Sequence, residues 1–317
     1  MTSPLRHVVD LLTYAGRRKG HDRADRLAVA DLVVAPTELG LPTGLDVRWL
    51  GVAGYAITYE GTTVLIDPYV SRATMADSLR RRPALPDPVL VDRWLPRADA
   101  VLLGHTHFDH AIDAPAVAAR DGATVYGSAS ARHLMALHGQ ADRAVEVTPH
   151  EPFAVGPFTI TFVPSQHSKL LLGRKVPNGG EITCEHVGAL TTQAYECGQV
   201  WGIHLSVDTP GGPFTLYHQG SADLIEDQIR HRGVDVFLCG VAGRQFTDDY
   251  TRRILRLLQP GTVVVGHHDD FFVPLGDEPG FAFGVDVARF PDEVAAVSRD
   301  IAVVTLPDPE PVGPAGR

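Results

Sequence analysis

The residues best suited to chemistry lie together in the segment Gly104–His110, which contains three histidines and one aspartate. Imidazole nitrogens and carboxylate oxygens are the usual protein ligands of zinc and similar divalent ions. Because residues two apart in an extended turn point the same way, His105 and His107 can hold one ion. Asp109 and His110 follow at the next bend and can face a second ion. A lone histidine is usually a surface or hydrogen-bonded residue, but four potential ligands at this density predict a metal site.

Short apolar runs predict the strands that must position this segment. They begin at Val47 and Trp49 and continue over 56–59, 62–66, 100–103, 123–126 and 158–162, and near Val187, Trp201, Phe214, Val236 and Val263. The run over 100–103 ends at Gly104, so it predicts a buried strand that places the histidines at its end. Glu60 and Gly61 separate two other runs and predict a hairpin turn.

Helices are predicted between these strands. One covers 129–137, and another starts at Thr247 and stops before Pro260, with one apolar face formed by Ile254, Leu257 and Leu258. The division of the chain is then an N-terminal helical extension over 1–45, a main domain over 46–306 and a Pro-rich tail over 307–317. A hairpin-rich first part followed by mixed strands and helices favours an α+β fold, or a layered sandwich with helices outside.

Composition limits the classes of function. The chain has 317 residues with a formal net charge of -10, so its surface repels phosphate backbones and no nucleic-acid partner is expected. The cysteines number three and form no CxxC motif, which indicates a reducing compartment. We expect no signal peptide, no membrane span and a cytoplasmic location. The oligomeric state stays open.

The histidine segment resembles the HxHxDH signature of the metallo-β-lactamase superfamily. The resemblance extends over most of the chain from about Asp46, with further marks at 49–51 and 66–68. It is nearest to the branch that includes L-ascorbate-6-phosphate lactonase and N-acylphosphatidylethanolamine phospholipase D. The resemblance implies a four-layer αββα sandwich within the α+β class. It also implies one or two bound metal ions, zinc above all, with Mn²⁺ or Fe²⁺ as alternatives.

The resemblance also implies how the ligands are shared between two ions. His105 and His107 look like ligands of the first ion, together with His167, which follows the strand ending at Phe162. Asp109 and His110 look like ligands of the second ion. Its later histidine is His267, preferred to His268 because His267 comes first after the strand over 262–265.

The bridging acid is where this sequence departs from the family. The family has Gly-Asp at a strand end, whereas Ser221 follows Gly220 here, and Asp223 lies two residues later. Asp223 reaches the ions if the turn is tight. In the other interpretation Ser221 caps a helix and Asp223 complements its dipole. Without a bridge from Asp223 the second ion binds more weakly, and one ion can suffice.

Asp67 follows a strand and precedes Pro68. The resemblance suggests that its carboxylate holds a ligand histidine by the other ring nitrogen. The alternative is an ordinary turn aspartate.

The function expected from the resemblance is metal-dependent hydrolysis of a small ester, lactone, amide or phosphodiester by a metal-bound hydroxide. Asp109 would be the catalytic residue that holds the nucleophile and passes a proton to the leaving group. A basic loop with Lys169, Arg174 and Lys175 allows an anionic substrate, or is merely solvated. The alternatives are a mononuclear iron oxygenase of the same fold and a non-catalytic metal-binding scaffold.

Overall fold

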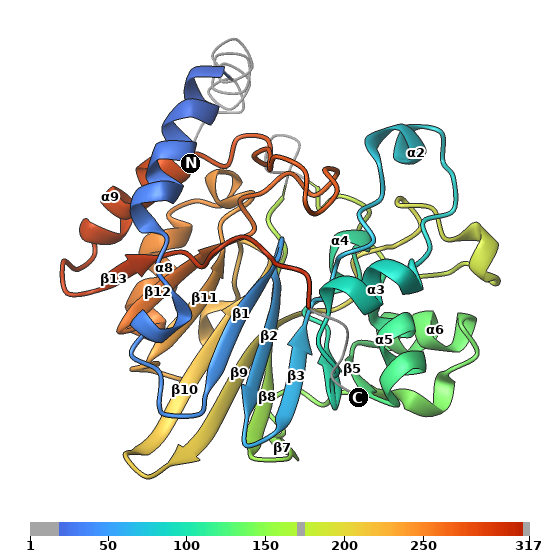
Figure 1. Cartoon of the computed structure of the whole chain (residues 1–317), viewed down its shortest axis with the longest axis horizontal. Coiled ribbons are helices and arrows are strands. Elements are labelled where there is room, and N and C mark those ends of the chain that lie inside the picture. The colour runs from blue at the N-terminus through green and yellow to red at the C-terminus, as the bar shows by residue number, and fades with distance from the viewer. Residues whose placement is uncertain (1–18, 170–174, 313–317) are drawn as a thin grey trace.

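The structure is a computed structural model that describes residues 19–169 and 175–312. Its strands form two sheets (Figure 1). The first has the order β1 (Asp46–Gly51), β2 (Gly54–Tyr59), β3 (Thr62–Ile66), β4 (Ala100–Leu102), β5 (Thr124–Gly127) and β6 (Ala144–Glu146). The second has the order β13 (Ala302–Val304), β12 (Thr262–Gly266), β11 (Val236–Gly240), β10 (Gly212–Gln219), β9 (Val200–Thr209), β8 (Phe158–Ser165) and β7 (Phe153–Val155).

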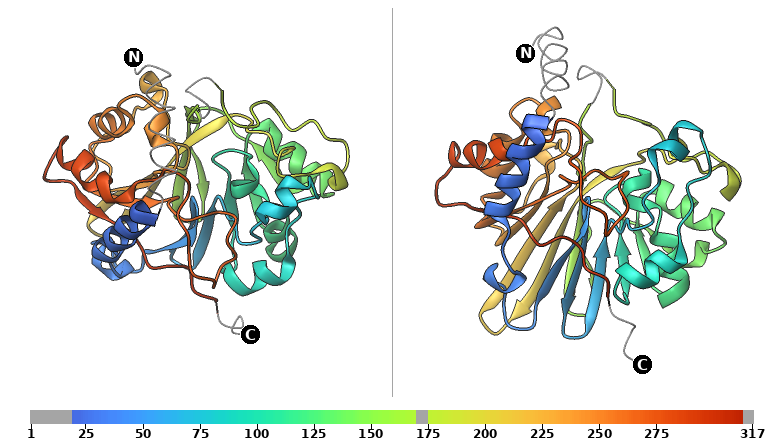
Figure 2. Two further views of the ribbon diagram at one scale, coloured as in Figure 1. Left: turned by 90° about the horizontal axis from the view of Figure 1, so that it is seen from above. Right: turned by 45° about the horizontal axis from the view of Figure 1, so that its top comes forward.

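Helices cover the outer face of each sheet, as the views in Figures 1 and 2 agree. On the first sheet these are α3 (Pro88–Trp94), α5 (Ala114–Asp121) and α6 (Ala129–Leu137), whereas α2 (Met75–Leu79) and α4 (Phe108–Ala111) lie beyond the strand ends. On the second they are α8 (Tyr250–Leu258), α9 (Phe290–Ala295) and the helical residues 19–32. The layers are therefore helix, sheet, sheet and helix, and the predicted αββα sandwich is confirmed.

Side-chain alternation along the strands explains why two sheets stack in this way. In β3, Val64 and Ile66 pack into the core between the sheets, whereas Leu65 packs against the helices. In β12, Val264 faces the inter-sheet core and its two neighbours face α8 and α9. Because successive residues of a strand point to opposite faces, a strand that is buried on both faces must be apolar throughout. This accounts for the continuous apolar runs in the sequence.

Several local predictions are confirmed in detail. The β2–β3 hairpin turns at Glu60 and Gly61, which both adopt positive φ angles, of 48° and 78°. Two successive positive φ angles belong to the turn type whose twist matches that of a two-stranded ribbon. The predicted helix over 129–137 is α6, and Ser128 caps it by accepting a hydrogen bond from the Ala131 N–H.

Two local predictions were wrong. The segment at Val187 is a short 3-10 turn, Val187–Ala189, in a loop without strand partners. The helix expected from Thr247 begins at Tyr250, because Asp249 takes a left-handed conformation at its N-cap position. Asp249 therefore precedes the helix, which starts three residues later than predicted.

The N-terminal helical stretch packs on the second sheet's helical layer as far as it is described. Ala28, Val29 and Leu32 contact the core under α8 and α9, and the Asp25 carboxylate accepts a hydrogen bond from the Ala288 N–H at 2.9 Å. Residues 1–18 and 313–317, which include the start of the predicted extension and the end of the predicted tail, lie outside the described residues. Among the helices that are described, none has the length and apolar character needed to cross a bilayer.

The loop after β3 is fixed by a buried carboxylate that the sequence did not single out. Asp113, fully buried before α5, accepts hydrogen bonds from the Val70 N–H at 2.6 Å, the Ser71 N–H at 2.9 Å and the Ser71 hydroxyl. Burial raises the pKa of this carboxyl to about 6. Because the loop begins at Asp67, the conformation of this potential site residue depends on Asp113.

We expect Asp113→Ala to destabilise the fold. Removing the carboxylate leaves two backbone donors without an acceptor, and each buried unpaired donor costs about 1–3 kcal/mol. The free energy of unfolding, measured by urea denaturation, should fall by at least about 2 kcal/mol. Asp142→Ala, at an exposed position, is the control and should change it by less than about 0.5 kcal/mol. Equal effects of the two substitutions would contradict this role for Asp113.

Candidate metal centre

The candidate site lies where strand ends from both sheets meet. Asp67 follows β3, the segment 105–110 follows β4, His167 lies just after β8 and His267 follows β12. β3 runs parallel to β4, and β8 runs in the same direction as β10 because each is antiparallel to β9. Carboxyl ends of equally directed strands share one edge of a sheet, which is where α/β folds place ligand sites.

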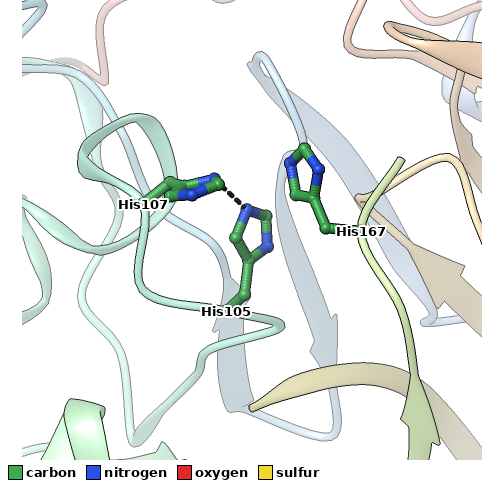
Figure 3. A group of neighbouring side chains, drawn as sticks. All are labelled: His105, His107 and His167. Carbon is green, nitrogen blue, oxygen red and sulfur yellow. Dashed lines mark hydrogen bonds between the residues drawn. The ribbon is translucent and has the colours of Figure 1, made fainter. Parts of the chain in front are cut away.

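One cluster consists of His105, His107 and His167, with one nitrogen of each within 4.8 Å of the others (Figure 3). His105 Nε2 lies 3.0 Å from His107 Nδ1. The outward nitrogens are held by backbone carbonyls: His107 Nε2 donates to the Pro177 carbonyl and His167 Nδ1 to the Ser168 carbonyl, each at 2.8 Å. These bonds fix the protons on the outward nitrogens, so the inward nitrogens present lone pairs to the cluster.

A second cluster consists of Asp109, His110 and His267. Asp109 Oδ2 lies 3.7 Å from His110 Nε2 and 3.6 Å from His267 Nε2. These separations exceed hydrogen-bond length and leave the three atoms facing one another. The rings of His105 and His110 are only 3.8 Å apart, so the two clusters are neighbours.

Asp67 supports the second cluster from behind. Its Oδ2 accepts a hydrogen bond from His110 Nδ1 at 2.8 Å, and its Oδ1 accepts one from the Gly104 N–H at 2.7 Å. A Cβ at Gly104 would lie 3.0 Å from this carboxylate, which explains why glycine precedes the histidines. The contact expected of Asp67 is therefore present, and it directs Nε2 of His110 toward Asp109.

Two of these residues occupy left-handed backbone conformations, which side chains other than glycine rarely adopt. Asp67 has φ 43° and His267 has φ 54°. His267 is held there by a hydrogen bond from its N–H to the Val52 carbonyl at 2.7 Å. Such strain concentrates at sites where function fixes a side-chain direction.

Burial governs the electrostatics of the cluster. It lowers the pKa of His105, His107 and His267 well below the usual range and that of His167 to about 4, and the neighbouring histidines add to this effect. His110 is the exception: burial acts to lower its pKa, but the carboxylates of Asp109 and Asp67 outweigh burial and raise it. Burial likewise raises the pKa of Asp109.

These observations test whether the residues fit a metal ion. The buried imidazoles of His105, His107, His167 and His267 are neutral, and it is unfavourable in a dry interior that their inward lone pairs face one another or a carboxylate. A divalent cation removes that cost because each inward atom is a metal donor of the kind zinc and related ions bind. The donor set and the outward hydrogen bonds therefore fit a metal centre.

The structure does not bring Asp223 into either cluster. Its Oδ1 accepts a hydrogen bond from the N–H of the next residue, Leu224, at 2.9 Å, and Arg253 Nη1 lies 4.0 Å away. The helix-cap alternative fails as well, because residues 221–225 form bends and coil and no helix starts at Ser221. Ser221 is buried, and its hydroxyl donates to the Gln166 carbonyl at 3.0 Å.

The structure brings His267, and not His268, to the second cluster. His268 turns away from the clusters and stacks on Trp49 with ring centroids 4.7 Å apart. Asp269 fixes the loop that carries both histidines. Its carboxylate accepts hydrogen bonds from the Val52 N–H at 2.9 Å and from Arg72 Nη2 at 2.8 Å. Although burial opposes ionisation, the Arg72 guanidinium lowers the pKa of the Asp269 carboxyl.

Sequence reasoning missed several supports of the site. The Pro177 carbonyl lies in the loop between β8 and β9, and nothing in the sequence singles out a carbonyl. Asp113 stands three residues after His110, and that spacing from the histidine segment was a usable signal. Arg72 and Asp269 are far apart in the chain, so their ion pair has no sequence signature. Arg174 of the predicted basic loop lies outside the described residues.

Comparisons with known proteins point in one direction. A family model described as "Beta-lactamase superfamily domain" matches residues 62–268. A "UPF0173 metal-dependent hydrolase" from Anaeromyxobacter dehalogenans (strain 2CP-C) is 30% identical over 279 residues, covering 84% of this chain and 86% of that protein. One from Carboxydothermus hydrogenoformans is 26% identical over 265 residues, covering 82% of this chain and 96% of that protein.

Solved structures agree on the fold. Igni18, a metallo hydrolase from Ignicoccus hospitalis, superposes with a TM-score of 0.51 at 17% identity, covering 84% of this chain and 97% of that one. CmlA, a diiron β-hydroxylase from Streptomyces venezuelae, has a TM-score of 0.53 at 15% identity, covering 86% of this chain and 54% of that one. Together with the family model and the relative at 30% identity, they lead to one conclusion: this chain belongs to the metallo-β-lactamase superfamily.

Proposed function

We propose that this chain is a metal-dependent hydrolase. His105, His107 and His167 would hold an ion at one position, and Asp109, His110 and His267 at a neighbouring one. The observation that carries the proposal is the orientation of the imidazoles. The outward nitrogens of His107, His167 and His110 each donate to a carbonyl or carboxylate, which leaves their inward nitrogens as lone-pair donors. The printed names of the relatives, metal-dependent hydrolases, support the same function.

A divalent ion held by these donors would lower the pKa of a bound water toward about 7 and polarise the bond to be cleaved. Asp109 is the residue that we propose moves the proton. Its carboxylate faces His110 and His267 and is almost completely buried, and burial raises its pKa toward the range of a useful proton carrier. Asp67 holds His110 in the ring orientation that this arrangement requires.

The substrate proposed is a small ester, lactone, amide or phosphodiester, because each has an electrophilic carbon or phosphorus that a hydroxide can attack. We propose zinc at the three-histidine position, since imidazole nitrogens suit that ion. The cytoplasm is the proposed compartment. The odd number of cysteines, Cys184, Cys197 and Cys239, and the lack of a CxxC motif support a reducing environment.

A second candidate, an iron oxygenase, is favoured by one specific observation. Asp109, His110 and His267 form a set of two histidines and one carboxylate, the donor set of many non-haem Fe(II) oxygenases. Metal analysis and oxygen uptake separate the two candidates. A non-catalytic metal-binding scaffold would show bound metal with no turnover of any ester, lactone, amide or phosphodiester probe and no oxygen uptake.

We expect His107→Ala to lose metal and activity together. Chromogenic lactone and phosphodiester probes should be turned over by zinc- or manganese-loaded protein, and the variant should lose more than about 100-fold in metal affinity, beyond the range for an outer hydrogen-bond partner. Inductively coupled plasma analysis and initial rates measure the two effects. His133→Ala, at an exposed histidine of α6, is the control and should keep both properties. Equal metal content in both variants would refute the ligand role of His107.

Asp67→Asn should weaken metal binding by about 10–100-fold without removing a ligand. An amide oxygen accepts the hydrogen bond from His110 Nδ1 less strongly than a carboxylate does. The Nε2 of His110 then becomes a weaker ligand for the metal ion. Competition with a chromogenic chelator measures the change in affinity. Asp99→Asn is the matched control, because the Asp99 carboxylate also accepts one backbone N–H, that of Thr63 at 2.8 Å, but at the opposite end of the strands. An unchanged affinity in Asp67→Asn would argue against this role.

A further inference from the structure

Negative charge is scarce in the two clusters. Asp109 is the one carboxylate among the six described side chains that compose them. Asp67 lies behind His110 and both of its oxygens are already engaged, by His110 Nδ1 and by the Gly104 N–H. Two divalent ions would bring four positive charges to a site whose nearby negative charges are those of Asp109 and, behind His110, Asp67. Since like charges at close range repel strongly in a buried site, a second ion is disfavoured unless another carboxylate lies between the two.

Ser221 lies close to the segments that support the two clusters. A Cβ on Gly220 would meet Asp67 Oδ2 at 3.1 Å, so the chain here lies against the support of the second cluster. The hydroxyl of Ser221 donates to the Gln166 carbonyl at 3.0 Å, and Gln166 directly precedes His167 of the first cluster. Ser221 therefore lies next to a residue that touches the support of the second cluster and contacts the residue before His167, and its side chain is uncharged.

The hydroxyl of Ser221 is also fully committed to the protein. It accepts a hydrogen bond from Gln219 Nε2 at 2.9 Å while donating to Gln166. Asp223, the nearest acid along the chain, is directed to the Leu224 N–H and toward Arg253. Neither residue supplies the missing charge.

The two clusters also differ in how well their histidines are oriented. In the first, His107 and His167 each donate an outward N–H to a carbonyl at 2.8 Å. In the second, His110 has such a partner, but Nδ1 of His267 is buried without a hydrogen-bond partner among the described residues. An imidazole without an outer partner is less well oriented and a weaker base.

We propose that the two positions bind metal unequally and that Ser221 sets the difference. The cluster of His105, His107 and His167 holds one ion firmly. The cluster of Asp109, His110 and His267 takes a second ion that exchanges readily with the medium. This inference rests on the metal centre of the proposed function and goes beyond it, because it concerns affinity and stoichiometry and not turnover.

Titration of chelator-treated full-length protein with Co²⁺ tests the inequality, because the ligand-field absorption of Co²⁺ follows each binding step. We expect two steps that differ by at least about 100-fold in dissociation constant, the size of effect that outer-sphere partners alone can produce. His167→Ala should weaken the tight step, whereas His267→Ala should remove the weak step and leave the tight one. Both variants keep Ser221, so they test the assignment without altering that position.

Ser221→Asp tests the cause. We expect the second step to tighten by at least about 10-fold, within the range for charged partners of metal sites. Ser221→Asn is the matched control: it has the same size and disturbs the same hydrogen bonds but adds no charge, so it should not tighten the step. Circular dichroism and thermal melting establish that both variants fold.

The outcomes separate this inference from the proposed function. Two equally tight ions in the wild-type protein, loss of the tight step in His267→Ala, or equal effects of Ser221→Asp and Ser221→Asn would each overturn it. Unequal binding without turnover of any substrate probe would support it and refute the hydrolase. No Co²⁺ binding at all would overturn both.

Discussion

Burial of several imidazoles with their lone pairs directed at one another is the constraint on which the rest of this structure depends. The interior cannot protonate them together, because each buried positive charge raises the cost of the next. Their orientation must therefore be imposed by the surrounding protein. Pro177, Ser168 and Asp67 do so by accepting the outward protons of His107, His167 and His110.

That orientation in turn requires two sheets to meet at one edge. Apolar side chains on both faces of the central strands drive the sheets and helices together, and this packing places the segments after β3, β4, β8 and β12 side by side. Polar contacts between these loops then fix their registers. Asp269 links the loop after β12 to Val52 and Arg72, and Asp113 fixes the loop after β3.

The parts of this arrangement that are local in sequence could be predicted from it. The histidine segment after an apolar strand, the Glu60-Gly61 hairpin and the helix α6 depend on near neighbours, and the resemblance supplied His167 and His267. Contacts between distant segments have no local pattern, so the ion pair of Arg72 with Asp269 and the carbonyl of Pro177 were not foreseen. Val187 was assigned to a strand on local apolarity alone, but the segment lies in a loop where no strand pairs with it.

The position of Asp223 shows a further limit of sequence reasoning. Both interpretations assumed a regular turn after β10, one toward the metal centre and one into a helix. The chain instead forms bends there, with the Asp223 N–H directed to the Ser221 carbonyl at 2.5 Å and the carboxylate to Leu224. The path of an irregular segment depends on tertiary contacts, which two residues of spacing do not encode.

The distribution of the six cluster side chains along the chain has a consequence for biosynthesis. The segment after β4 contributes four of them, and His167 and His267 come from the second sheet. During synthesis the first sheet emerges before His167 and His267, and so with an incomplete set of donors. The complete set of six donors therefore exists only once both sheets have assembled. Binding of the ion then stabilises the folded domain by mass action. A truncated chain without the complete set of donors gains no such stabilisation.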